Sequence, residues 1–288
     1  MDRSSDSIGA SAKSHVNVIG CVSAPQTPGQ KTLSNRAVAT AKMSFFMDGV
    51  KSTATFGFMR WIPNALTLGN ALMGCLALTF LRIMDLESLT YCMGLALFFD
   101  LLDGWAARKL GTDGPMGVQL DSLADAITFG VVPGLLWLHA GMAFLPWWFA
   151  FIGLAPTLAS IYRLARFNLG LAGSKGFVGM PTPANALFLL GVVWAMETGV
   201  LPKLEGSMAM VAFGIITAWS TYTLNSPWTI MSFKDMPRGG AALASRIFFA
   251  LLSLALLIIF QVAAFAFIIP LLLVFSTLEN RVFKPTAS

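Results

Sequence analysis

The sequence predicts an all-α integral membrane protein with about eight transmembrane helices. Hydrophobic residues make up 56% of the 288 residues and charged residues only 11%, whereas an ordinary soluble domain carries about 25% charged residues. From residue 62 onward, apolar segments long enough to cross a bilayer follow one another. This composition excludes a water-soluble globular enzyme, a disordered chain and a nucleic-acid-binding module, despite a net charge of +5.

The chain divides into two regions near residue 60. Residues 1–58 are rich in Ser, Ala, Thr, Gly and Lys and show no sustained apolar period. We therefore expect them to form a mobile, basic cytoplasmic tail. Residues 59–284 contain all the apolar segments, and we expect them to form one transmembrane domain.

Eight spans are predicted if each crossing takes about 20 residues. Their approximate bounds are Ile62–Leu81, Leu89–Lys109, Gly117–Ala140, Trp147–Phe167, Pro183–Val200, Met208–Leu224, Ile247–Phe260 and Val262–Leu278.

The last two spans depend on an argument from charge. The segment from Ile247 to Leu278 is too long for one upright helix and short for two. Arg246 precedes this segment and Arg281 follows it. Because Lys and Arg favour the cytoplasmic side, the two arginines share that side only if the chain crosses twice. A tight hairpin near Gln261 is therefore predicted.

Positive charges also predict the orientation of the whole chain. With the tail in the cytoplasm, 17 of the 19 Lys and Arg residues fall in cytoplasmic segments, and only Arg82 and Lys203 fall on the opposite side. Both termini are therefore expected in the cytoplasm. We expect the protein in the bacterial inner (cytoplasmic) membrane.

Four acids fall inside or at the ends of the second and third spans: Asp100, Asp103, Asp121 and Asp125. A charge at membrane depth costs about 2.5–3.5 kcal/mol on insertion scales, and such residues mark functional sites by default. The first two acids are three residues apart and the last two are four apart, so each pair shares one helix face. Two adjacent antiparallel helices can therefore direct four carboxylates at one point.

This cluster indicates a site for a divalent cation and a phosphate. Like charges at such distances need cations, and oxygen ligands suit Mg²⁺, Mn²⁺ or Ca²⁺. Gly104, Ala107 and Gly117 leave space beside the acids, and Arg108 can meet a phosphate group. The alternative is a proton or cation relay in a transporter, which also uses buried acids.

The same residues resemble a family signature. Asp100-Leu-Leu-Asp103-Gly104-Trp-Ala-Ala107-Arg108, followed by Gly117-Val-Gln-Leu-Asp121-Ser-Leu-Ala-Asp125, matches all eight fixed positions of D-x2-D-G-x2-A-R-x8-G-x3-D-x3-D. This is the pattern of the CDP-alcohol phosphotransferase family. The resemblance implies an integral membrane enzyme with a six-helix core. Such an enzyme displaces CMP from a CDP-linked lipid or alcohol with a hydroxyl acceptor, using divalent metal, Mg or Mn, as one ion or two.

Further segments are similar to the bacterial and archaeal phosphatidylserine synthase branch of that family. They are Ile62-Pro63-Asn64-Ala-Leu-Thr67, Arg163-Leu-Ala-Arg166-Phe-Asn168, Gly179-Met-Pro181-Thr-Pro183 and the looser match Asn225–Lys234. The resemblance covers about residues 60–280 and leaves the tail out. It implies transfer of the phosphatidyl group from CDP-diacylglycerol to the hydroxyl of L-serine, with 59–284 as the catalytic domain.

The resemblance also implies roles for individual residues. Asp100, Asp103 and Asp121 would hold metal, and Asp125 would act as the base and share in the metal site. The CDP pocket would be shaped by Asp100, Gly104, Ala107, Arg108 and Gly117. Asn64 and Thr67 are three residues apart on one helix face, and we expect them to contact the nucleotide, with capping and packing of the first helix as the equally weighted alternative.

Arg163 and Arg166 share one face at the end of the fourth span, and we expect them to bind the serine carboxylate or a phosphate. Anchoring by the positive-inside rule is the alternative for these arginines. Lys234 is equally compatible with a lipid phosphate and with a solvated position.

Three functions remain open at this point. The first is serine transfer, and the second is transfer to another acceptor such as glycerol phosphate, inositol phosphate or choline. The third is an ion-coupled transporter. Membrane lipids and a second copy of the chain, as a homodimer, are the expected partners, and nucleic acid is not expected.

Overall fold

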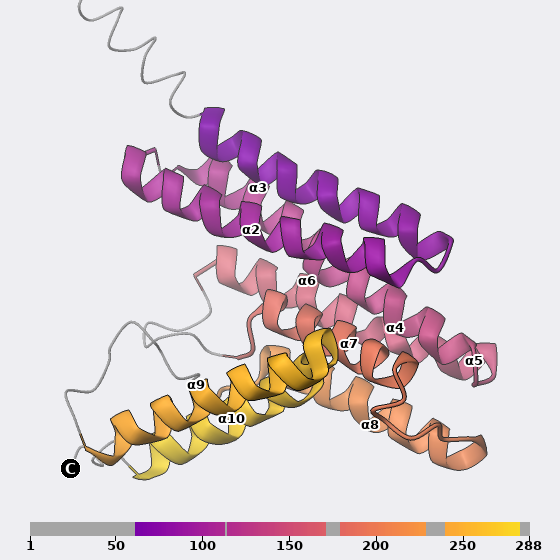
Figure 1. The fold of residues 1–288 in the computed structure, drawn as a ribbon. Coiled ribbons are helices and arrows are strands. Elements are labelled where there is room, and N and C mark those ends of the chain that lie inside the picture. Colours follow the sequence, from indigo (N-terminus) through magenta and orange to yellow (C-terminus); the bar gives the residue numbers. More distant parts are fainter. Residues whose placement is uncertain (1–60, 113, 171–178, 229–239, 283–288) are drawn as a thin grey trace, which may run out of the picture. The chain divides into compact units, whose positions relative to one another are not determined.

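The computed structural model describes residues 61–112, 114–170, 179–228 and 240–282. Every regular element in these ranges is a helix (Figure 1). The predicted tail, residues 1–58, and Lys234 lie outside the described residues. Within the described ranges, six stretches are long and apolar enough to cross a membrane. The predicted all-α integral membrane protein is therefore confirmed.

The helices follow the predicted spans closely. The first described helix, Trp61–Arg82, is called the 61–82 helix below. The helices after it are α2 (Leu86–Leu110), α3 (Pro115–Asp125), η1 (Ala126–Val131), α4 (Val132–Met142), α5 (Trp147–Ala150), η2 (Phe151–Leu154), α6 (Ala155–Asn168), α7 (Thr182–Glu197), α8 (Gly206–Asn225), α9 (Ala241–Phe260), η3 (Gln261–Ala264) and α10 (Phe265–Val282).

The hairpin predicted near Gln261 is confirmed. Gln261 has a φ of 50° and ends α9, and α10 runs beside α9 in Figure 1. The Arg246 guanidinium, near the start of α9, donates to both carboxylate oxygens of Glu279, near the end of α10, at 3.1 and 2.5 Å. In one straight helix these residues would be about 50 Å apart. The bidentate ion pair therefore fixes two antiparallel helices.

The 61–82 helix packs very closely against η1, which is a π-helix. A methyl group at Gly74 would collide with the Thr128 side chain. The Thr128 hydroxyl donates across this contact to the backbone oxygen of Asn70, at 3.1 Å. Glycine at position 74 therefore brings the polar face of the 61–82 helix against the segment that follows Asp125.

A second close contact holds α6 against the same segment. The Thr157 hydroxyl donates to the backbone oxygen of Gly130 at 3.0 Å. A side chain at Gly134 would overlap the Thr157 hydroxyl. The 61–82 helix and α6 thus flank η1 from two directions. Residues at the ends of these helices are consequently brought to the acids of α3.

Candidate active site

A short turn places the acids of α2 next to those of α3. Gly111 ends α2 in the left-handed conformation, with φ 60°, and its backbone N–H donates to the Ala107 oxygen. Pro115 opens α3 only a few residues later, where proline is well tolerated because no N–H is needed. The last part of α2 and the first part of α3 are therefore neighbours along the chain and in space.

Three of the four predicted acids meet at one point. Asp100, Asp103 and Asp121 each offer one carboxylate oxygen, and these oxygens lie within 4.8 Å of one another. Oxygen donors at this spacing can together hold a divalent cation. An Asp cluster that could bind metal is thus present where the spacing predicted it.

Asp103 is buried and linked to the 61–82 helix. Its Oδ2 accepts a hydrogen bond from the Thr67 hydroxyl at 2.5 Å, and that hydroxyl also lies 3.0 Å from the Pro63 backbone oxygen. A hydroxyl has one proton, so it serves one acceptor at a time. Thr67, predicted to bind the nucleotide, therefore contacts an acid of the cluster directly.

Asp125 lies beside the three-acid cluster and has its own buried partner. Its Oδ1 accepts a hydrogen bond from the Asn70 amide at 3.3 Å. The charges of Asp100, Asp121 and Asp103 nevertheless act on Asp125. Asn70 is fully buried, and among the described residues its Oδ1 has no hydrogen-bond partner.

Asn70 is the site residue that the sequence analysis missed. It lies three residues after Thr67 and six after Asn64 on one face of the 61–82 helix. A buried Asn in an apolar helix is costly unless its amide is paired. The polar residues at positions 64, 67 and 70 indicated that one face of this helix belongs to the site. The pairing of Asn70 with Asp125 could not be predicted, because it depends on the packing of helices far apart in sequence.

Two glycines predicted for the site lie next to polar side chains. A Cβ added to Gly104 would lie 3.4 Å from Nη1 of Arg108, so the guanidinium folds over this glycine. A Cβ added to Gly117 would lie 3.8 Å from Oδ1 of Asn64. Ala107, one turn after Asp103, is half-buried. Asn64 thus lies near Gly117 of α3, and Arg108 lies near Gly104 of α2.

The two arginines of α6 have different surroundings. Arg163 is close enough to Asp125 for the charges of the two side chains to interact. Its Nε is buried and has no hydrogen-bond partner among the described residues. Arg166 instead lies over the ring of Tyr162, with Cζ 5.9 Å from the ring centroid. The prediction treated the two as a pair, whereas the structure brings Arg163 near Asp125 and Arg166 over an exposed tyrosine.

Asn168 holds the end of α6 against α3. Its Oδ1 accepts from the Ser122 hydroxyl at 2.9 Å, and its amide donates to Oε1 of Gln119 at 3.2 Å. Ser122 and Gln119 flank Asp121 on α3. This link keeps the arginines of α6 at the acid-bearing end of the bundle, on the left of Figure 1.

Comparison with known proteins identifies the family. The profile of the CDP-alcohol phosphatidyltransferase family matches residues 60–231. Among curated relatives, the CDP-diacylglycerol–serine O-phosphatidyltransferase of Bacillus subtilis is 35% identical over 132 residues, which are 46% of this chain and 75% of that protein.

Archaeal proteins are also similar to the chain. The archaetidylserine synthase of Methanothermobacter thermautotrophicus is 34% identical over 54% of this chain and 66% of its own length. The CDP-diacylglycerol–serine O-phosphatidyltransferase of Methanocaldococcus jannaschii is 39% identical over 45% of this chain and 59% of its own length. The matches thus span between 59 and 75% of these three relatives.

The region that the profile matches begins just before the 61–82 helix and extends past α8. It therefore includes the acids of α2 and α3, Asn70 and both arginines of α6. The resemblance to the family signature is confirmed, and the chain belongs to the CDP-alcohol phosphatidyltransferase family.

Proposed function

We propose that this protein transfers the phosphatidyl group of CDP-diacylglycerol to the hydroxyl of L-serine, forming phosphatidylserine and releasing CMP. The meeting of three carboxylates from α2 and α3 within 4.8 Å carries the proposal. This group of carboxylates supports a site for a charged diphosphate at the end of a membrane-spanning bundle. The names of the relatives from Bacillus subtilis and Methanocaldococcus jannaschii support CDP-diacylglycerol and serine as the substrates.

Mg²⁺ or Mn²⁺, as one ion or two, is the proposed cofactor. Asp100, Asp103 and Asp121 supply only hard oxygen donors, which fit these ions. Asp125, four residues after Asp121 on the same helix face, is proposed to share in holding a second ion. When bound, the metal neutralises charge on the diphosphate and on the departing CMP.

Asp125 is the proposed general base. A serine hydroxyl is a weak nucleophile near neutral pH and needs a base to take its proton. The serine oxygen forms a bond to the β-phosphorus, which carries the diacylglycerol group, and the bond from that phosphorus to the CMP oxygen breaks. Asp125 accepts the hydroxyl proton. The hydrogen bond from Asn70 supports this role because it fixes one carboxylate oxygen and leaves the other available.

The CDP moiety is proposed to lie against the residues around the cluster. Gly104 and Gly117 present no side chain to the diphosphate, and the Arg108 guanidinium, which folds over Gly104, can contact a phosphate oxygen. Asn64 and Thr67, from the 61–82 helix, would contact the nucleotide on the other side. Asp100 and Ala107 complete this surface on α2.

Arg163 and Arg166 are proposed to bind the serine carboxylate or a phosphate. Arg163 is favoured for the carboxylate, because its buried Nε lacks a partner among the described residues and a bound carboxylate would supply one. Arg166, whose guanidinium lies over the exposed Tyr162 ring, is suited to a phosphate at the membrane surface.

The proposed orientation places both termini and the acids in the cytoplasm of a cell, in the bacterial inner membrane. The distribution of Lys and Arg supports this orientation. Residues 1–58 are proposed to be a cytoplasmic tail and residues 59–284 the catalytic domain. A homodimer is the proposed assembly.

A panel of acceptors tests the proposed function. Membranes that contain the protein are mixed with CDP-diacylglycerol and serine, glycerol phosphate, inositol phosphate or choline. CMP and the lipid product are then measured by mass spectrometry. Serine-dependent CMP release with phosphatidylserine as the product is expected, and an Asp100→Asn protein is the inactive control. Product from another acceptor would reassign the substrate, and no CMP with any acceptor would favour an ion-coupled transporter.

A further inference from the structure

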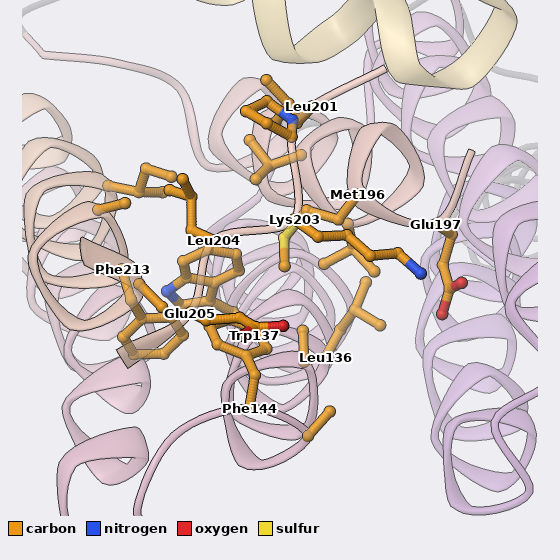
Figure 2. Close-up of a pocket in the computed structure, with 18 of the residues that line it drawn as sticks. Leu136, Trp137, Phe144, Met196, Glu197, Leu201, Lys203, Leu204, Glu205 and Phe213 are labelled. Carbon is orange, nitrogen blue, oxygen red and sulfur yellow. The ribbon is translucent and has the colours of Figure 1, made fainter. Parts of the chain in front are cut away.

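A cavity of about 570 Å³ is lined by side chains of α4, α7 and α8 (Figure 2). Its volume is within the range of ligand sites, roughly 300–1,000 Å³. It is formed by the end of α4, the end of α7, the connection from α7 to α8 and the first half of α8. Its apolar wall includes Leu136, Trp137, Phe144, Val193, Met196 and Phe213.

The cavity is too far from the acids to hold the reacting groups. Ala140, which lines it, follows Asp121 by 19 residues along α3, η1 and α4. At 1.5 Å per residue this path is about 28 Å, close to the thickness of the hydrocarbon core, about 30 Å. The cavity therefore belongs to the opposite leaflet and plays no part in the chemistry at the acids.

The wall of the cavity is fixed by its own contacts. The rings of Trp137 and Phe213 stack with centroids 4.4 Å apart. Trp137 Nε1 donates to the Thr217 hydroxyl at 2.8 Å, so the indole presents only apolar surface to the cavity. Phe213 packs against Gly141, where a Cβ would lie 2.6 Å from its ring. A wall held in this way keeps its shape without a ligand.

Three charged side chains also line this otherwise apolar cavity. Glu197 is the last residue of α7, and Lys203 and Glu205 lie in the connection to α8. All three are exposed, and Figure 2 shows them among the apolar side chains. One cation and two carboxylates next to an apolar cavity complement a ligand that carries an anion, a cation and a hydrocarbon chain.

We propose that this cavity binds one acyl chain of a zwitterionic phospholipid from the leaflet opposite the acids. The lipid phosphate contacts Lys203, and its ammonium group contacts Glu197 or Glu205. A hydrocarbon chain gains little from leaving the bilayer for an equally apolar cavity, so the headgroup charges decide which lipid binds. The net negative charge of the three residues disfavours a lipid whose headgroup is only anionic.

Photolabelling of the full-length protein in nanodiscs tests the proposal. The probe is phosphatidylethanolamine with a diazirine in one acyl chain, and labelled peptides are mapped by mass spectrometry. We expect labelling to concentrate in residues 136–144 and 192–216. Unlabelled phosphatidylethanolamine should compete with the probe, and phosphatidylglycerol at the same concentration should not.

Two pairs of variants make the test specific. Ala212→Phe fills the cavity and should abolish this labelling, whereas Ala218→Phe, on an exposed position of the same helix, should not. Lys203→Gln should weaken competition by phosphatidylethanolamine about five-fold, the effect of one cation near a lipid surface. Arg82→Gln, an exposed cation near the same membrane face, is its control.

Several outcomes would overturn the proposal. Labelling spread evenly over the helices and unchanged by Ala212→Phe would mean that the cavity holds no lipid. Equal competition by phosphatidylglycerol would contradict the assigned headgroup. Labelling that avoids the cavity in the unmodified protein would indicate another occupant, such as a second copy of the chain. Competition is measured on the unmodified protein. The proposal can therefore be refuted even if a variant fails to fold.

Discussion

At one end of the helix bundle, Asp103 and Asp125 are buried and each accepts a hydrogen bond from a polar side chain of the 61–82 helix. At the other end, the cavity between α4, α7 and α8 is mostly apolar, and its charged side chains are exposed. Buried carboxylates stay charged in a membrane protein only with partners or cations. The acid end therefore needs a bound cation or ligand to balance its negative charge. The cavity end is instead defined by the shape of its apolar wall.

Removal of divalent metal should abolish turnover, because the carboxylates of Asp100, Asp103 and Asp121 repel one another and the diphosphate without it. CMP release is measured after chelation and again after Mg²⁺ or Mn²⁺ is added back. Asp100→Asn should be equally inactive in both conditions while it still elutes as a folded protein. Full turnover in the chelated enzyme would show that the acid cluster does not work through metal.

Arg163→Ala should raise the serine KM by about 10- to 150-fold, since loss of a charge-assisted hydrogen bond costs about 1.5–3 kcal/mol. The KM for CDP-diacylglycerol should change much less. Arg166→Ala is the matched variant on the same helix, and we expect a smaller effect because its guanidinium lies over Tyr162. Arg163→Lys should raise the serine KM less than Arg163→Ala does, but still above that of the unmodified protein, because lysine lacks the planar guanidinium that contacts both carboxylate oxygens.

Steady-state kinetics with each substrate varied in turn separate the possible roles of these arginines. If the lipid KM rises in Arg163→Ala and the serine KM does not, Arg163 binds phosphate. A larger serine effect in Arg166→Ala than in Arg163→Ala would contradict the distinction drawn from the structure.

Asn70→Ala should lower kcat by roughly 10- to 100-fold, the usual effect of removing a residue that orients a ligand or catalytic group. Asn185→Ala is the control, because Asn185 is also a fully buried Asn in a helix but pairs with Ser220 at 2.5 Å. Both variants should lower thermal stability. Equal kcat values for the two would mean that Asn70 serves only packing.

Thr217→Val should have the smallest effect on activity and a clear effect on stability. It leaves Trp137 Nε1 without its acceptor, which costs about 1–3 kcal/mol for a buried group. Thermal unfolding in detergent should show the loss, while kcat and the serine KM stay within about two-fold. A large fall in kcat would show that the two ends of the bundle are coupled.

The sequence predicted the parts of the structure that depend on local pattern and charge. Helix spans follow from hydropathy, and the hairpin at Gln261 followed from the requirement that Arg246 and Arg281 share a side. The acids were found because charge inside an apolar helix is costly, and their spacing gave their common face.

The remaining features depend on contacts between distant helices. Asn70 meets Asp125 across 55 residues of sequence, and no periodicity specifies that pairing. Arg163 and Arg166 are equivalent by spacing, and only the packing of α6 on α3 distinguishes them. The cavity was missed because its walls read as ordinary lipid-facing or core residues in the sequence.

The π-helix η1, residues Ala126–Val131, begins directly after Asp125. A π-turn holds more residues than an α-turn, so it changes the rotational phase between α3 and α4. One residue corresponds to about 100° of rotation in an α-helix. Removing one residue from this segment would therefore turn Asp121 and Asp125 away from Asp100 while α4 kept its buried face. Because the π-turn lies between α3 and α4, Asp121 and Asp125 can face Asp100 while α4 keeps its buried face in the core.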